Sequence, residues 1–120
     1  MAQYFKPETD PKLFFCPCCG HSIIDIVLLT KLDALRTLYG RPIYVNSGFR
    51  CEEHNIAIGG NINSEHMDGK GADLRCRSSR DRFELVKYAT EVGFRRIGIA
   101  DTFIHVGSCK KRPQDVIWTY

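Results

Sequence analysis

The chain has 120 residues, 43% of them hydrophobic, and carries a formal net charge of +3. This length and apolar content suit one domain with a modest core, and we expect residues 1–120 to form a single domain. The charge is mild and the basic residues are scattered, apart from the run Lys110–Arg112, so we expect no nucleic-acid partner. No segment is apolar over the length of a membrane span, so we expect no membrane insertion.

The first half of the chain is predicted to contain a long helix, a short strand and a short helix. Leucines recur at helical spacing between Asp25 and Tyr39, and Gly40 would end this helix. The apolar run Ile43–Val45 is typical of a short buried strand. Glu52–Ile58 is predicted to form a short helix that ends before two glycines.

The second half is predicted to be richer in strands. Ala72–Cys76 is expected to be a strand, and Arg80–Val92 a helix capped by a preceding serine. The expected inner face of this helix is apolar: Phe83, Val86, and Ala89 or Tyr88. Three further segments are expected to form a short antiparallel ribbon: Arg96–Ala100, Phe103–Val106 and Val116–Thr119. This order of elements predicts an α+β fold, with helices packed on one small, mainly antiparallel sheet.

Two histidines and one aspartate form the most informative pattern. Asp73 follows His66 by seven positions, and His105 lies in an apolar, strand-like run further on. Gly69 and Gly71 fit a tight reversal between the first two. Two imidazoles and one carboxylate are a common catalytic zinc set, because three protein ligands leave a fourth position open. The alternative is a hydrogen-bonded core histidine and an aspartate that caps the turn.

Several motifs occur in an order that resembles a known family. They are Ser47–Cys51, Glu53–Asn55, Gly59–Gly60, Ser64–Asp73 and Ile97–Val106. This order is similar to that of the zinc D-Ala-D-Ala carboxypeptidase family, in particular its short branch of phage lysins and bacterial murein peptidases. The resemblance extends over nearly the whole chain, and its most specific segment resembles the signature SxHxxGxAxD.

The resemblance implies roles for five residues. His66, Asp73 and His105 would be the zinc ligands. Arg50 would hold a carboxylate of the substrate, and Ser64 would contribute to the same pocket. A guanidinium is a permanent, planar, bidentate partner for a carboxylate, which agrees with this role. The alternative for Arg50 is a solvated loop arginine.

The general base is where the chain departs from the family. Thr102 stands where larger relatives have a glutamate, and Gly107 stands where many short members read His-x-Asp. The nearest carboxylate is Asp101, which we predict to be the catalytic base. It could instead orient the last histidine or cap a turn. Glu65 and Asp68 are weaker candidates that we expect to be solvated loop acids.

Six cysteines raise the question of disulfides or a second metal site. They are Cys16, Cys18, Cys19, Cys51, Cys76 and Cys109. The dense cluster Cys16–His21 could close a site by itself, but its spacing is tight and a second ligand pair is missing. We therefore expect free thiols, and we expect Cys51 to be a packing residue.

These observations predict a zinc metallopeptidase that hydrolyses peptidoglycan stem peptides, as a D,D-carboxypeptidase or endopeptidase or by cutting L-Ala–D-Glu. The alternative is an inactive zinc-binding module of the same fold that binds cell wall or protein. This alternative rests on Thr102 and Gly107, the two positions that depart from the family pattern. A serine or cysteine peptidase is disfavoured, because no serine or cysteine lies in a nucleophile-elbow context.

We expect a monomer whose partner is a peptidoglycan peptide. The segment Met1–Pro7 lacks the apolar stretch of a signal peptide. The expected location is therefore the cytoplasm as synthesised, with action on the cell wall after release, as for a phage or prophage lysin.

Overall fold

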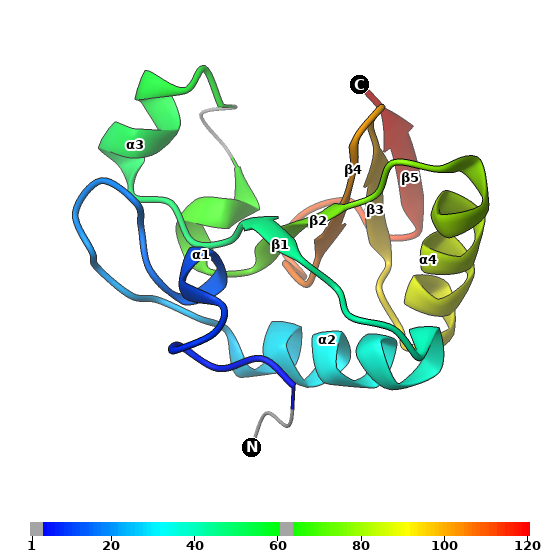
Figure 1. Cartoon of the computed structure of the whole chain (residues 1–120). Helices are drawn as coiled ribbons and strands as arrows, with labels where there is room; N and C mark the ends of the chain where they lie inside the picture. Colours follow the sequence, from blue (N-terminus) through cyan, green and yellow to red (C-terminus); the bar gives the residue numbers. More distant parts are fainter. Residues whose placement is uncertain (1–3, 61–63) are drawn as a thin grey trace.

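The computed structural model describes residues 4–60 and 64–120. Its helices are α1 (Pro11–Phe14), α2 (Ile26–Tyr39), α3 (Glu52–Ala57) and α4 (Ser79–Glu91), with one 3-10 helix, η1 (Glu65–Asp68). Its strands are β1 (Val45–Ser47), β2 (Gly71–Arg75), β3 (Arg96–Ile99), β4 (Phe103–Gly107) and β5 (Val116–Thr119). The predicted α+β fold is confirmed, with α2 and α4 packed next to each other against one sheet (Figure 1). None of the described helices has the length and apolar character needed to cross a membrane.

The five strands form one sheet in the order β1-β2-β4-β3-β5. All neighbouring pairs are antiparallel except β3 and β5, which run parallel. The prediction of a wholly antiparallel ribbon was therefore wrong for β5. The reason is the segment between β4 and β5, which returns the chain to the start of β3. There the Val116 N–H donates to the Arg95 carbonyl at 3.1 Å, and β5 then follows β3 in the same direction.

Alternation along the strands separates a core face from a site face. Ala72 and Leu74 of β2, and Ile104 and Val106 of β4, are fully buried in the hydrophobic core. The residues between them therefore point to the opposite face of the sheet. The register of the strands places four residues in one row across the sheet: Asp73 on β2, His105 on β4, Gly98 on β3 and Trp118 on β5.

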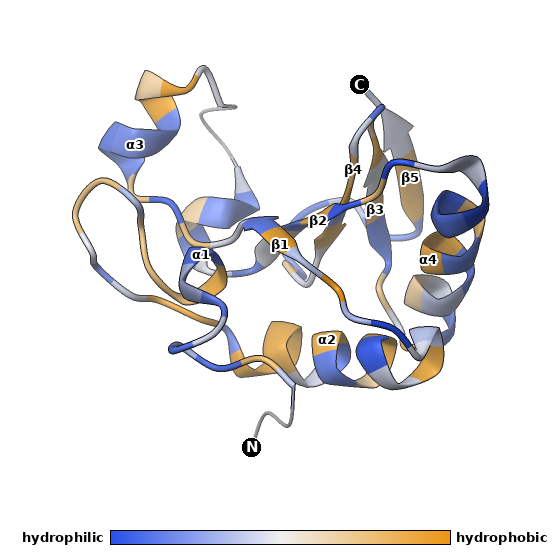
Figure 2. Ribbon diagram, viewed as in Figure 1, coloured by the Kyte–Doolittle hydropathy of each residue, from blue (hydrophilic) through white to orange (hydrophobic). Residues whose placement is uncertain are grey.

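Helix α2 covers the core face as the leucine pattern predicted. Asp25 caps its first turn by accepting from the Leu28 N–H at 3.1 Å, and Gly40 ends it in the left-handed conformation. Its buried residues are Leu28, Leu29, Leu32 and Leu35. Polar and apolar residues alternate along α2 and α4, as expected of helices with one buried side (Figure 2).

Helix α4 begins at its serine cap as predicted, since the Ser78 hydroxyl accepts from the Asp81 N–H at 3.1 Å. Its buried face was predicted wrongly at Phe83, which is 69% exposed. Leu85 is buried in its place, together with Ala89. Residues two positions apart lie on opposite sides of a helix, so burial of Leu85 turns Phe83 to solvent.

The short helix α1, which sequence patterns did not predict, positions the loop that carries Arg50. The Gly48 and Phe49 N–H groups donate to backbone carbonyls of α1, at 2.8 and 3.2 Å. A Cβ at Gly48 would collide with the Leu13 backbone, so this close approach requires glycine. Pairing with β2 also places β1 at Val45–Ser47 rather than the predicted Ile43–Val45.

Candidate functional site

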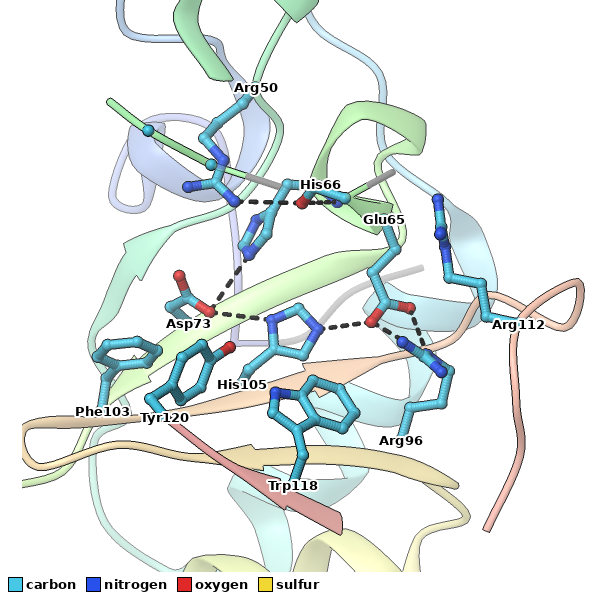
Figure 3. Close-up of a pocket in the computed structure, with 13 residues that line it drawn as sticks. Arg50, Glu65, His66, Asp73, Arg96, Phe103, His105, Arg112, Trp118 and Tyr120 are labelled. Atoms are coloured by element: carbon cyan, nitrogen blue, oxygen red, sulfur yellow. Dashed lines mark hydrogen bonds and ion pairs between the residues drawn. The ribbon is translucent and has the colours of Figure 1, made fainter. Parts of the chain in front are cut away.

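The predicted metal ligands come from three adjacent elements. Asp73 on β2 and His105 on β4 are direct cross-strand partners. His66 lies on η1, which precedes β2 and is bounded by Ser64 as its N-cap and Gly69 as its left-handed end. The turn between His66 and Asp73 therefore brings these two side chains together, and the pairing of β2 with β4 adds His105 (Figure 3).

The three ligand atoms converge on one point. His66 Nε2 and His105 Nδ1 lie 3.2 and 3.0 Å from the same oxygen of Asp73, Oδ1. One donor atom from each residue lies within 4.8 Å of the others. Both histidines are buried, and the Asp73 side chain is only 14% exposed. This spacing fits a single metal ion bound by two nitrogens and one oxygen.

Hydrogen bonds to the far nitrogen of each imidazole support this fit. His66 Nδ1 lies 2.6 Å from the Gly48 carbonyl, and His105 Nε2 lies 2.6 Å from a Glu65 carboxylate oxygen. An oxygen of either kind can only accept, so each of these nitrogens carries the proton. The other nitrogen of each ring faces Asp73, and its lone pair is available to a metal ion when that nitrogen carries no proton. Histidines that ligate metals are held in this way.

The electrostatics of the site keep its carboxylates ionised. Burial raises the pKa of Asp73, but hydrogen bonds from His105 and His66 outweigh it and hold the pKa below its usual range. Burial likewise opposes ionisation of Glu65, yet the hydrogen bond from His105 and the charge of Arg96 lower its pKa. Burial alone would lower the pKa of His105, but its bonds to both carboxylates raise it. The site is therefore built to hold positive charge.

Glu65 was predicted to be a solvated loop acid, and this was wrong, because it is only 3% exposed. Its carboxylate accepts from His105 Nε2, from Arg96 Nε at 3.2 Å and from the Cys109 N–H at 3.3 Å. Asp68, the other acid of η1, is exposed as predicted. A buried carboxylate with three donors is a fixed part of the site.

Glycines make room for these side chains. A Cβ at Gly107 would overlap the Glu65 carboxylate, so the departure of this position from the family pattern has a steric cause. A Cβ at Gly71 would lie 2.8 Å from His105 Cε1 and 2.9 Å from Glu65 Cγ. The packing around His105 therefore depends on glycines on the neighbouring strand β2 and on β4 itself.

A cavity of about 440 Å³ opens over the three ligands. The side chains and glycines that line it are Arg50, Gly59, Gly60, Ser64, Glu65, His66, Asp73, Arg96, Phe103, His105, Arg112, Trp118 and Tyr120. The lining contains three arginines and two carboxylates, so positive charge is in excess and the cavity suits an anionic or carboxylate-bearing ligand. Trp118 lies beside His105, with ring centroids 5.4 Å apart.

Arg50 and Ser64, the residues predicted to bind substrate, both line this cavity. Arg50 Nη2 donates to the Ser64 hydroxyl at 3.2 Å, while Arg50 Nε is buried and has no hydrogen-bond partner among the described residues. Burial lowers the pKa of Arg50 and the Asp73 charge opposes this. The guanidinium is therefore partly buried beside the ligand cluster with a donor to spare.

Asp101, the predicted base, is not among the described residues that line the cavity. It lies exposed in the turn between β3 and β4, where its backbone carbonyl accepts from Arg82 Nη2 at 3.0 Å. It therefore lies in the turn and not on either of the two strands. Its role as the base stays a prediction.

Sequence reasoning considered Glu65 only as a weak candidate for the base, and it missed five other residues of the cavity wall: Arg96, Phe103, Arg112, Trp118 and Tyr120. Trp118 could have been found only from the parallel pairing of β5 with β3, because that register sets it opposite Gly98. A Cβ at Gly98 would lie 2.6 Å from Trp118 Nε1, so the indole lies directly over this glycine.

Comparisons with known proteins agree with this geometry. A zinc D-Ala-D-Ala carboxypeptidase from Streptomyces albus G is 41% identical to this chain over 73 residues, which are 60% of the chain. The match spans only 28% of that relative's length. Residues 12–107, the larger part of the chain, match the family described as peptidase M15. The resemblance inferred from the motifs is thereby confirmed, and the chain belongs to the peptidase M15 family.

Proposed function

We propose that this chain is a zinc metallopeptidase that hydrolyses stem peptides of peptidoglycan, as a D-Ala-D-Ala-type carboxypeptidase or endopeptidase. The observation that carries the proposal is the convergence of donor atoms from His66, Asp73 and His105 inside the cavity. Two imidazoles and one carboxylate are a donor set that zinc enzymes use. The Streptomyces albus G relative is named a zinc D-Ala-D-Ala carboxypeptidase, which supports zinc as the metal and a D-Ala-D-Ala bond as the target in this chain.

The chain's own residues hold this site in a defined state. The Gly48 carbonyl and the Glu65 carboxylate fix the protons on the far nitrogens of the two imidazoles, so their near nitrogens remain free to coordinate. A zinc ion bound there supplies a Lewis acid and lowers the pKa of water, which is the chemistry that amide hydrolysis needs.

Arg50 and Ser64 form the proposed carboxylate-binding pair. Arg50 lines the cavity with its Nη2 donating to the Ser64 hydroxyl, and a planar guanidinium can bind a carboxylate through two hydrogen bonds. A stem peptide that ends in D-Ala presents such a carboxylate, which would set the position of its last peptide bond relative to the metal ligands. Phe103, Trp118 and Tyr120 add an aromatic wall against which small alanine side chains pack.

The second candidate function is an inactive zinc-binding module that binds cell wall or protein, and one observation favours it. The carboxylates among the described cavity residues are Asp73 and Glu65, and both are engaged by histidines. Asp101, the proposed base, lies outside the cavity lining. A peptidase of this design would therefore need Asp101 or another base to accept a proton from the attacking water.

Murein digestion tests the proposal. Purified zinc-loaded protein is incubated with murein and with a synthetic stem peptide ending in D-Ala-D-Ala, and the products are identified by mass spectrometry. We expect release of D-Ala or of a cross-link fragment, and no release by His66→Ala or after chelation. Wild-type protein that holds zinc but releases nothing, while binding intact cell wall, would instead support the inactive module.

A further inference from the structure

A second cluster of metal-binding side chains lies outside the cavity. It consists of Cys16, Cys18 and Cys19, in the loop between α1 and α2, and Cys51, which caps the start of α3. Their four sulfur atoms all lie within 4.8 Å of one another. In Figure 1 the loop between α1 and α2 rises along the side of the molecule next to α3, and sulfur contacts join the two.

The distances between the sulfur atoms suit a tetrahedral site. Cys16 Sγ lies 3.6 Å from Cys18 Sγ, and Cys18 Sγ lies 3.3 Å from Cys51 Sγ. Zinc–thiolate bonds of about 2.3 Å place the corners of a tetrahedron about 3.8 Å apart. The sulfurs therefore surround a space of the size that one zinc ion fills. A single disulfide would use only two of the four.

The backbone around the cluster is arranged to support the sulfurs. The Cys51 N–H donates to Cys16 Sγ and the His54 N–H donates to Cys51 Sγ, both at 3.4 Å. The loop closes on itself, since the Gly20 N–H donates to the Cys16 carbonyl at 2.9 Å. N–H groups aimed at sulfur stabilise negative charge on it, and a zinc-bound thiolate carries that charge.

We propose that Cys16, Cys18, Cys19 and Cys51 bind a structural zinc ion, distinct from the metal of the cavity. Four thiolates complete the tetrahedral coordination and leave no open position, which is the property of structural rather than catalytic sites. All six cysteines are free of disulfides, as expected, and this assignment gives four of them a metal-binding role in place of the packing role expected for Cys51. Cys51 takes the place that His21 had in the sequence-based candidate.

This site would stabilise the loop that carries Arg50. Cys51 follows Arg50 directly, and the Arg50 N–H donates to the His66 carbonyl at 3.1 Å. The cluster thus ties the segment after α1 to the backbone that leads into the cavity. Because metal binding is coupled to folding, loss of this ion should loosen the loop first.

Metal analysis of the reduced, full-length protein tests the proposal. We expect two equivalents of zinc in the wild type and one in Cys18→Ser, in Cys19→Ser and in His66→Ala. Cys18 and Cys19 are exposed, so these replacements leave the hydrophobic core intact. Cys76→Ser is the control for loss of a cysteine outside the cluster; Cys76 is buried in the core, so this variant is the more disruptive one, and it should still retain both equivalents.

Cobalt distinguishes the two sites and does not depend on the proposed peptidase activity. Co²⁺-loaded His66→Ala should show intense thiolate-to-cobalt charge-transfer absorption, and Cys18→Ser should lose most of it. A reduced His66→Ala protein that binds neither Zn²⁺ nor Co²⁺ would overturn the proposal. So would freshly purified wild type in which two of the four cysteines form a disulfide and reduction restores no metal binding.

Discussion

The Glu65 carboxylate lies in the space that a side chain at position 107 would need. Gly107 is also where many short members of the family carry an aspartate. In this chain the buried carboxylate next to His105 comes from η1 rather than from β4, and it reaches His105 Nε2 at 2.6 Å. A glutamate at position 65 and a side chain at position 107 therefore cannot occupy this space together, so the residue at one position depends on the residue at the other.

Gly107→Ala tests this exclusion. The added methyl group displaces the Glu65 carboxylate, and we expect a loss of about 1–3 kcal/mol in the free energy of unfolding, as for overpacked cores. Urea denaturation of the metal-free protein measures it. The loss of stability caused by Gly107→Ala should be smaller in a Glu65→Ala background, because the colliding carboxylate is then gone. Equal costs in the two backgrounds would show that the two positions are independent.

Glu65→Gln should weaken metal binding at the cavity without removing a ligand. The amide keeps the shape but no longer offers a charged acceptor to His105, so we expect zinc affinity to fall about 10–100-fold. Competition with a chelator at fixed pH measures this affinity. Asp68→Asn, on the same short helix but exposed, is the control and should leave the affinity unchanged. If both variants bind zinc as the wild type does, Glu65 has no part in holding His105.

Arg50→Lys should weaken hydrolysis of substrates that present a carboxylate. An ammonium cannot reproduce a two-bond fork, and a lost charge-assisted hydrogen bond costs about 1.5–3 kcal/mol in kcat/KM. Steady-state kinetics on a stem peptide, compared with its C-terminal amide, measure the effect. The variant should discriminate less between the two peptides. Arg77→Lys, in an exposed loop, is the control; if it lowers kcat/KM as much, the effect does not come from the two-bond fork of Arg50.

Asp101→Asn decides whether the base assigned from the sequence acts in catalysis. A base at this position requires turnover to fall about a hundredfold while zinc remains bound. The exchange preserves shape, and the contact with Arg82 uses the backbone carbonyl, so folding should be retained. Wild-type turnover in the variant would remove Asp101 from the catalytic machinery, as its exposed position outside the cavity lining suggests.

Asp25 should make the fold sensitive to acid. Burial raises its pKa, but hydrogen bonds from Ser108, the Leu28 N–H and Lys70 outweigh it and lower the pKa below its ordinary value. A carboxyl group whose pKa is lower in the folded state stabilises the fold above its unfolded pKa and loses this contribution as pH falls through its folded pKa. Asp25→Asn should therefore be less stable than wild type at neutral pH, and the gap should narrow in acid.

Urea denaturation of both proteins over a pH series measures the gap. Asparagine also caps helices well, so the variant isolates the charge of Asp25 from its capping hydrogen bond. A stability difference that stays constant from neutral pH into acid would exclude ionisation of Asp25 as its cause.

The sequence predicted features whose signals are local. Helix α2 follows from leucine spacing between an aspartate cap and Gly40, and the strand Val116–Thr119 was predicted with the bounds that the structure shows. His66 and Asp73 are close in sequence, and the glycine turn between them already indicates that they meet.

The rest depends on contacts between distant segments. The parallel pairing of β5 is set by the path of the segment before it, which no periodicity reports. Cys51 lies 32 positions from Cys19, and only the packing of α1 against the Arg50 loop brings it to the other cysteines. Glu65 looked like a loop acid because its partners, His105 and Arg96, come from strands that follow much later.

Trp118 gives the cavity a built-in optical reporter. It is the only tryptophan of the chain, its ring centroid lies 5.4 Å from that of His105, and the Arg96 guanidinium lies over its face at 5.1 Å. Because the chain has one tryptophan, all indole emission comes from Trp118, and this emission responds to nearby charge. Metal uptake at the cavity and entry of a peptide can therefore be followed by intrinsic fluorescence, whereas events at the cysteine cluster should leave this emission unchanged.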